Sequence, residues 1–252
     1  MRPRLFVLTG ASRGLGAAMA RRLLAPEHTL LCLSRQADDA LATSAVEAGA
    51  TLEQWRVDLA DAAPVSTRLA AWLGAFDPVR VASASLINNA GALAPIGSLQ
   101  DASAADLAAA LRVGLEAPLL LCAAFLRATA SWPADRRILN ISSGLGRRAM
   151  AGQATYCAAK AGMDQLSRAL ALEQGGTVHG ARIVSLAPGV VDTDMQVQLR
   201  AASRPGFPDH DAFVRLKEGG KLASADEAAA RVLAYLARSD FGETPVADVR
   251  DA

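Results

Sequence analysis

Short apolar runs alternate with longer Ala- and Leu-rich stretches along most of the chain, and no other feature constrains the fold as strongly. The runs have the length of strands, and the stretches between them have the length of helices. Strands that alternate with helices form parallel sheets, because each helix carries the chain back to the same edge of the sheet. The sequence therefore predicts an α/β fold, with one doubly wound parallel sheet of six or seven strands and helices on both faces. The expected strands are residues 5–9, 29–34, 52–57, 84–88, 137–142 and 182–186, and the expected helices are residues 15–24, 38–48, 64–76, 103–130, 155–174 and 225–238.

Size and charge narrow the classes of protein to which the chain can belong. The 252 residues contain no linker or repeat that divides them, so residues 1–252 are expected to form a single domain. A net charge of +1 gives no field that would hold nucleic acid or an anionic membrane, and neither is expected as a partner. The apolar run near the N-terminus is too short for a secretion signal, and the longest uncharged run, residues 117–126, covers about half of a membrane span. A soluble, cytoplasmic protein is expected.

The cysteines and histidines show no pattern that predicts chemistry. Cys32, Cys122 and Cys157 form no CxxC pair, and buried, reduced thiols are the favoured interpretation. The three histidines have no spacing typical of metal ligands, so no metal site is predicted.

A glycine-rich turn, Thr9-Gly10-Ala11-Ser12-Arg13-Gly14-Leu15-Gly16, connects the first expected strand to the first expected helix. Glycine permits the tight turn and lets backbone N–H groups at the helix N-terminus approach a pyrophosphate. The turn is a weak signal by itself, but a strand before it and a helix after it supply the context of a dinucleotide site.

The residues that follow the second and third strands indicate which dinucleotide binds. The second strand ends at Ser34-Arg35, where an acidic residue would hold the 2′-hydroxyl of NAD and an arginine suits the 2′-phosphate of NADP(H). Arg13 can add a second positive charge, although surface charge is the alternative for both arginines. Asp58, followed by Leu59, is placed to accept from adenine or to cap the next helix.

Three further motifs follow the fourth and fifth strands. Asn89-Ala90-Gly91 is small and polar where the crevice of the sheet should open. Ser143 follows the fifth strand, and Tyr156 and Lys160 are four residues apart, so they share a face of the next helix. A nearby ammonium favours the phenolate form of a tyrosine, so this pair predicts a tuned proton donor, with Ser143 as a hydrogen-bond donor to a carbonyl oxygen.

In this order, the motifs resemble the short-chain dehydrogenase/reductase family over the whole chain. The resemblance implies a Rossmann-type domain in which Ser143 polarises a carbonyl, Tyr156 transfers the proton, and Lys160 holds the nicotinamide ribose and lowers the pKa of the tyrosine. It also implies that the segment from Pro188 to Thr193 passes the nicotinamide. The expected NADP(H)-binding residues are Gly10, Ser12, Arg13, Gly14, Leu15, Gly16, Ser34, Arg35, Asp58, Leu59, Asn89, Ala90, Gly91, Tyr156, Lys160, Pro188, Gly189, Val191 and Thr193.

A narrower resemblance, to the sepiapterin reductase and bacterial benzil reductase branch, is carried by residues 188–196, 216–222 and 246–251. It implies reduction of a dicarbonyl or pterin-like ketone by NADPH. The carboxylate of Asp248 or Asp251 is expected to bind the substrate, with a surface aspartate as the alternative. The Pro- and Gly-containing segment 192–223 is expected to be a substrate lid, with a surface excursion as the alternative. By resemblance, residues 103–130 and 155–174 also form the interface of a homodimer or homotetramer. The expected substrate residues are Leu145, Gln153, Val190, Met195 and Asp248, with Arg148 and Met150 also shaping the pocket.

One position departs from the family pattern. Gly114 stands where family members usually carry a helical asparagine that supports a water relay to the lysine. A catalytically silent dinucleotide-binding regulator is therefore one alternative function, although Ser143, Tyr156 and Lys160 are intact. A ketoacyl reductase or sugar-alcohol dehydrogenase of the same family is another. Glycine inside a helix costs about 1 kcal/mol relative to alanine, so we expect close packing or a local bend at Gly114 to compensate.

Overall fold

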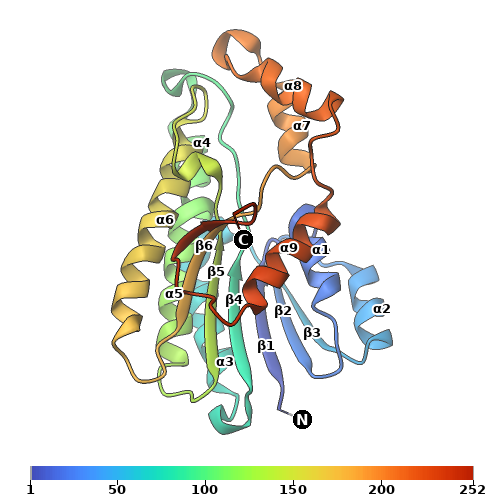
Figure 1. Cartoon of the computed structure of the whole chain (residues 1–252), viewed down its shortest axis with the longest axis vertical. Helices are drawn as coiled ribbons and strands as arrows, with labels where there is room; N and C mark the ends of the chain where they lie inside the picture. Colours follow the sequence, from blue (N-terminus) through green and yellow to red (C-terminus); the bar gives the residue numbers. More distant parts are fainter. Residues whose placement is uncertain (1, 252) are drawn as a thin grey trace.

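A computed structural model describes residues 2–251 and contains one seven-stranded sheet with every neighbouring pair of strands parallel (Figure 1). The strand order is β3-β2-β1-β4-β5-β6-β7, so the order reverses between β1 and β4. The predicted Rossmann-type, doubly wound fold is confirmed. The strands are β1 (Arg4–Thr9), β2 (His28–Ser34), β3 (Thr51–Arg56), β4 (Ser83–Asn88), β5 (Asp135–Ile141), β6 (Arg182–Ala187) and β7 (Val246–Asp248).

Helices bury both faces of this sheet, which explains why its central strands appear in the sequence as continuous apolar runs. Along β1, Phe6 and Leu8 pack on one face and Leu5 and Val7 on the other, as the two-residue period of a strand requires. The helices are α1 (Gly14–Arg22), α2 (Asp39–Glu47), α3 (Ala62–Gly74), α4 (Ala104–Leu111), α5 (Ala117–Ala128), α6 (Ala154–Gly175), α7 (Asp194–Ala201), α8 (His210–Glu218) and α9 (Ala225–Ala237).

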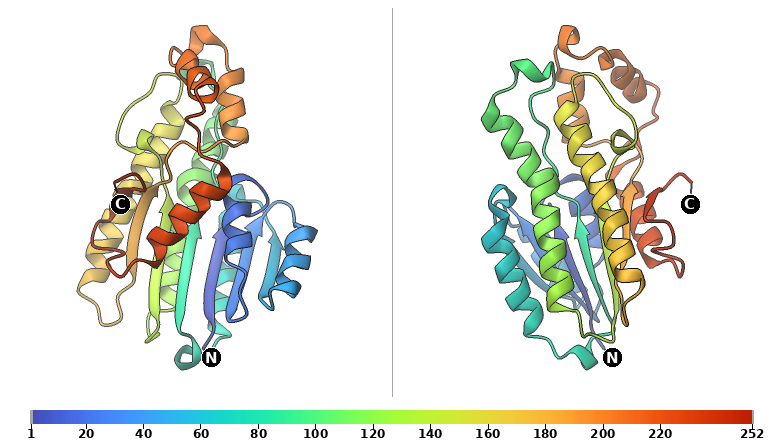
Figure 2. Two further views of the ribbon diagram at one scale, coloured as in Figure 1. Left: turned by 45° about the vertical axis from the view of Figure 1, so that its right-hand side comes forward. Right: turned by 90° about the vertical axis from the view of Figure 1, so that its left-hand side faces the viewer.

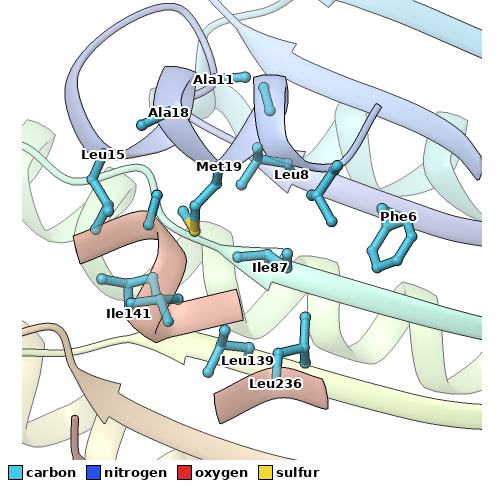
Figure 3. Packing of buried hydrophobic residues seen from close by; sticks show 14 of the residues in the cluster. Phe6, Leu8, Ala11, Leu15, Ala18, Met19, Ile87, Leu139, Ile141 and Leu236 are labelled. Carbon is cyan, nitrogen blue, oxygen red and sulfur yellow. The ribbon is translucent and has the colours of Figure 1, made fainter. Parts of the chain in front are cut away.

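The core is divided by the sheet into two halves. Helices α1 and α9 cover one face, and Figure 3 shows Met19 of α1 and Leu236 of α9 beside Ile87 and Leu139 of the sheet. Helices α3, α5 and α6 cover the opposite face (Figure 2, right), where Phe125 of α5 is fully buried. Packing on both faces fixes the strands, and with them the positions of the carboxyl ends of β1, β4, β5 and β6.

The expected single helix over residues 103–130 is interrupted. Helix α4 passes into a π-helical segment, Arg112–Glu116, before α5 begins, and Gly114 lies in its middle. A β-carbon on Gly114 would lie 3.1 Å from the β-carbon of Ala159 in α6. The local distortion and the close packing expected as compensation for this glycine are therefore both present.

The segment 192–223 is folded rather than irregular. It contains α7 and α8, joined through a short 3-10 turn at Arg204–Gly206, and it stands above the carboxyl ends of the strands in Figure 1. Its two ends are held together, because Asp192 N donates to Ala223 O over 2.9 Å and Ala223 N donates to Val190 O over 3.0 Å. Phe207, which is fully buried, packs with Met150 and Leu199 and fastens the segment to the body of the domain.

By length and composition alone, the helical stretch from Ala104 to Ala128, which includes the π-helical segment, is apolar enough to cross a membrane, with a mean hydropathy of 1.7 over its 18 most apolar consecutive residues. Core helices of soluble proteins are often as apolar, and 44% of this stretch is buried inside the protein. The helix is therefore weak evidence for a membrane span. Across residues 2–251, no group of three or more His, Cys, Asp or Glu side chains could hold a metal ion.

Two of the three cysteines meet the expectation of buried thiols. Burial raises the pKa of Cys32 and of Cys122 to about 12 in each case, so both remain protonated at neutral pH. Cys157 is partly exposed, which the sequence did not predict. It follows Tyr156 on α6 and packs at the edge of the cluster of Met150, Leu199 and Phe207.

Candidate active site

A cavity of about 640 Å³ opens at the carboxyl ends of the strands. Each residue that the sequence predicts for catalysis, coenzyme binding or substrate binding lines this one cavity. The parallel arrangement explains this, because loops that follow parallel strands meet at one edge of the sheet. The lining includes Gly10, Ser12, Arg13, Gly14, Leu15, Gly16, Ser34, Arg35, Asp58, Leu59, Asn89, Ala90, Gly91, Ser143, Leu145, Arg148, Met150, Gln153, Tyr156, Lys160, Pro188, Gly189, Val190, Val191, Thr193, Met195 and Asp248.

The glycine-rich turn is shaped by close backbone contacts. Gly10 and Gly14 have φ values of 69° and 54°, in the left-handed region that favours glycine. A β-carbon on Gly16 would lie 2.0 Å from the carbonyl oxygen of Gly10, so no other residue fits there. The turn therefore presents bare backbone at the N-terminus of α1, which fits a pyrophosphate group.

The start of the Asn89-Ala90-Gly91 motif holds this turn in position. The amide nitrogen of the Asn89 side chain donates to Thr9 O over 3.0 Å and to Gly10 O over 3.2 Å. In the other direction, Thr9 Oγ1 accepts from the backbone N–H groups of Asn89 and Ala90, each over 2.9 Å. The motif is thus a support for the turn as well as part of the cavity wall.

Charged side chains of both signs line the cavity near the end of the second strand. Ser34 is buried and its hydroxyl donates to Gln36 O over 2.7 Å, which turns the chain so that Arg35 is exposed at the cavity rim. Asp58 accepts from Ala60 N over 2.9 Å and so caps the short 3-10 turn Leu59–Asp61. It also lines the cavity, and its contact with adenine stays a prediction. Arg13 forms an ion pair with Asp194 at the start of α7, with 2.9 Å between Nη1 and Oδ2.

Tyr156 and Lys160 lie one turn apart on α6, as their spacing predicts. The Lys160 Nζ atom donates to the carbonyl oxygen of Ile141 over 2.7 Å and lies 5.6 Å from the centroid of the Tyr156 ring. Ser143 caps a short 3-10 turn, Gly144–Gly146, by accepting from Leu145 N over 3.2 Å. The three side chains thus come from the end of β5 and the first turns of α6.

Burial changes the proton affinities of Tyr156 and Lys160 in opposite directions. It raises the pKa of Tyr156 to about 12, against the lowering effect of the neighbouring Ser143 side chain. It lowers the pKa of Lys160 to about 8, against the opposing charge of Asp164. Burial therefore decides the direction of the net shift at Tyr156, and the ammonium of Lys160, which is expected to lower that pKa, is bonded to Ile141 O.

The far end of the cavity has an apolar wall with a few polar groups. Its expected members Leu145, Met150, Val190 and Met195 are joined by three side chains that the sequence did not predict: Leu93, Leu199 and Phe213. Gln196 was also missed, and its buried Oε1 atom has no hydrogen-bond partner among the described residues. The alternating polar residues of α7 gave no signal that would separate those facing the cavity from those facing solvent.

Asp248, rather than Asp251, is the carboxylate at the cavity. Its two oxygens accept from Arg250 over 2.8 and 2.6 Å, and Asp251 is exposed. The paired Arg250 guanidinium holds the pKa of the Asp248 carboxyl below its usual range. Arg250 was not predicted from the sequence, and it lies in the turn that follows β7.

A nucleotide-binding sheet with a serine, a tyrosine and a lysine at its carboxyl edge defines a class of oxidoreductases. The family model described as short chain dehydrogenase matches residues 4–204. The chain belongs to the short-chain dehydrogenase/reductase family.

Three relatives show which members the chain is similar to. Benzil reductase ((S)-benzoin forming) of Bacillus cereus is 33% identical over 243 residues, which make up 96% of this chain and 98% of that protein. Sepiapterin reductase of Meriones unguiculatus is 34% identical over 247 residues, covering 93% of this chain and 92% of the relative. A crystal structure of a short-chain dehydrogenase/reductase from Burkholderia vietnamiensis, 35% identical, superposes with a TM-score of 0.67 over 99% of this chain and 98% of that one.

Replacing Tyr156 with Phe removes the phenol while keeping the ring. Because general acid catalysis contributes about 10²- to 10⁴-fold, carbonyl reduction should fall by that factor, and the Kd for NADPH should stay within about twofold of wild type. Tyr235→Phe, at the other tyrosine of the chain, is the matched control and should leave both values unchanged. A Tyr156→Phe enzyme with more than about a tenth of wild-type turnover would rule out proton donation by this residue.

Gly114→Asn tests the position that departs from the family pattern. An asparagine β-carbon at 3.1 Å from that of Ala159 needs a shift of only a few tenths of an ångström, so turnover should change by less than about tenfold. Gly114→Ala, which adds the β-carbon without the amide, separates the steric effect from the effect of the side chain. A gain of about a thousandfold on introducing Asn would instead identify the wild-type protein as a silent regulator.

Proposed function

We propose that this protein reduces a carbonyl group, in a dicarbonyl compound or a pterin-like ketone, to an alcohol with NADPH as the hydride donor. The observation that carries the proposal is that Ser143, Tyr156 and Lys160 line the same cavity as the glycine-rich turn. A coenzyme on that turn and a substrate beside the tyrosine would therefore meet in one enclosed space.

The residues at the adenosine end of the cavity fit NADP(H). The glycine-rich turn offers bare backbone to a pyrophosphate, and its shape depends on Gly16, where a β-carbon would collide with the Gly10 carbonyl. Arg35 stands at the rim with no ion-pair partner among residues 2–251, so its guanidinium is free for a phosphate. Residues 34 and 35 carry no carboxylate, the group that an NAD-binding site would place there.

The catalytic residues have separate tasks in this proposal. When bound, the nicotinamide supplies the hydride. Ser143 donates a hydrogen bond to the carbonyl oxygen and stabilises the negative charge that develops there. Tyr156, whose pKa is raised to about 12, stays protonated at neutral pH and donates its proton to that oxygen. Lys160 carries its ammonium group at the base of the pocket and orients the ribose.

The substrate end suits a flat or bulky apolar carbonyl compound. Leu145, Met150 and Met195 supply apolar surface, and Asp248 is the carboxylate that can accept from a substrate N–H group. Benzil reductase, among the relatives, is named for an aromatic diketone, which supports a dicarbonyl substrate. Sepiapterin reductase supports the pterin-like alternative.

Segment 192–223 acts in this proposal as the substrate lid. Met195, Leu199 and Phe213 reach the cavity from α7 and α8, and the Arg13–Asp194 ion pair joins the segment to the glycine-rich turn. An exposed ion pair of this kind stabilises by at most about 1 kcal/mol, so it does not prevent opening.

We also propose a cytoplasmic homodimer or homotetramer. Leu119 of α5 and Leu172 of α6 are 46% and 84% exposed, and exposed large apolar side chains on helices expected at the interface support self-association.

A substrate screen tests the proposal directly. Oxidation of NADPH should be followed with vicinal diketones, quinones, pterins, simple ketones, β-ketoacyl thioesters and sugar ketones. Diketones or pterins should give the highest kcat/KM. Preference for ketoacyl or sugar substrates would favour the other enzyme class in this family, and tight NADPH binding without any turnover would favour the regulator.

The coenzyme preference is predicted from Arg35. A charge-assisted hydrogen bond to the 2′-phosphate contributes about 1.5–3 kcal/mol, so kcat/KM should be at least about tenfold higher with NADPH than with NADH. Arg35→Asp should narrow or reverse this ratio, whereas Arg231→Asp, on the exposed side of α9, should leave it unchanged. Equal constants for the two coenzymes in the wild-type protein would contradict the assignment.

A further inference from the structure

Asp164 is a buried carboxylate for which neither the coenzyme nor the proton transfer gives a role. It lies on α6 one turn after Lys160, and its residue is 1% exposed. Taking a carboxylate out of water costs several kcal/mol unless partners compensate for it. Its partners, and their places in the fold, therefore indicate what this residue does.

Three side chains from three different segments surround Asp164. Its Oδ1 atom accepts from the hydroxyl of Ser142, at the end of β5, over 2.5 Å and from that of Ser185, on β6, over 2.6 Å. The Nε atom of Arg147 lies 3.2 Å from Oδ2. This contact has the distance of an ion pair but not the alignment of a hydrogen bond, so its strength comes from charge.

These partners lie on both sides of Ser143. Ser142 precedes it directly, and Arg147 follows the 3-10 turn that Ser143 caps. Arg147 also donates from Nη2 to Ala247 O over 2.9 Å, next to Asp248 at the substrate end. The backbone around Ser143 is therefore held at two points by one carboxylate.

The same carboxylate acts on Lys160. Two contacts join α6 to the end of β5 in parallel: Lys160 Nζ to Ile141 O over 2.7 Å, and Asp164 to Ser142. Gly146 fits closely between them, since a β-carbon there would lie 2.8 Å from Asp164 Oδ2 and 2.9 Å from Lys160 O. Any change at Asp164 thus reaches the serine and the lysine together.

We infer that Asp164 and Arg147 form a positioning pair, which fixes the Ser143 hydroxyl and the Lys160 ammonium relative to each other for carbonyl reduction. Neither residue of the pair touches the reacting atoms in this role. The inference deepens the proposed function and rests on it.

Charge gives the pair a signature that a merely structural role lacks. The charged and titratable groups near Lys160 are Tyr156 and Asp164 on α6 and Arg147 beyond the 3-10 turn, while β5 presents the Ile141 carbonyl. The Asp164 carboxylate favours the ammonium form and raises the pKa of Lys160. The Arg147 guanidinium lies 3.2 Å from that carboxylate, so its positive charge opposes the field of the carboxylate at Lys160. Removing the charge of Asp164 should therefore lower the pKa of Lys160, and removing the charge of Arg147 should raise it.

The test compares Asp164→Asn and Arg147→Met in the full chain. Asparagine retains an oxygen for the two serine hydroxyls, and Arg147 is partly exposed, so both variants should fold. Displacement of Ser143 should lower kcat in each by about ten- to a hundredfold, with the Kd for NADPH, from nucleotide fluorescence, within about threefold of wild type. Arg231→Met is the control, and Arg147→Lys should restore part of the lost kcat.

The pH profile of kcat decides the inference. Activity that needs the ammonium falls as pH rises through the pKa of Lys160. That fall should move by about half a pH unit or more to lower pH in Asp164→Asn and to higher pH in Arg147→Met. Shifts in the same direction, unshifted profiles, or a kcat close to wild type in both variants would overturn the inference. Wild-type turnover reports separately on the proposed function, since it does not depend on either substitution.

Discussion

The close approach of the turn after β1 to the end of β4 is the constraint on which the site depends. A β-carbon on Gly16 would collide with the Gly10 carbonyl at 2.0 Å, and one on Gly10 would lie 3.0 Å from the α-carbon of Ala90. The hydrogen bonds from the Asn89 side chain close the remaining gap. These contacts lie where the strand order reverses, which is where a doubly wound sheet opens its crevice. The wall of the site at the glycine-rich turn is therefore backbone, and its shape follows from packing of the sheet.

Burial determines the direction of the pKa shifts of the two titratable side chains that α6 contributes to the site. The same loss of water raises the pKa of Tyr156 to about 12 and lowers that of Lys160 to about 8. A phenol that keeps its proton is suited to donate it to an oxygen that is becoming an alkoxide. With a pKa of about 8 the lysine is mostly an ammonium at neutral pH, and the charge of Asp164 opposes the effect of burial. Burial thus keeps the Tyr156 phenol protonated at neutral pH, and it lowers the pH above which Lys160 loses its ammonium charge.

The sequence predicted the fold well because buried parallel strands appear as apolar runs whatever the details of packing. It also predicted many of the residues that line the cavity, since the residues after parallel strands meet at one edge, but not those that α7 and α8 contribute to the substrate end. Close packing or a bend at Gly114 was expected from the sequence, but the π-helical form of the distortion and the neighbour Ala159, 45 positions along the chain, were not. The ion pair of Arg13 with Asp194 could not be predicted either, since 181 positions separate the two residues along the chain.

The direction of the net pKa shift at Tyr156 could not be read from the sequence for a related reason. Spacing places Lys160 on the same helical face, but burial decides the direction of the shift, and burial is a property of the whole fold. Asp164 was missed because an aspartate on a helix usually faces solvent, and only the packing of α6 against β5 and β6 shows that it does not.

Transfer of a labelled hydride tests the central claim most directly. The wild-type protein should be incubated with a vicinal diketone and NADPH carrying deuterium at C4 of the nicotinamide, and the product examined by mass spectrometry. The account predicts a hydroxyketone with one deuterium on the new carbinol carbon, formed in equal amount to the coenzyme oxidised when the transferred face is labelled. A product without deuterium from either labelled face of the coenzyme, or no reduced product while NADPH remains bound, would contradict it.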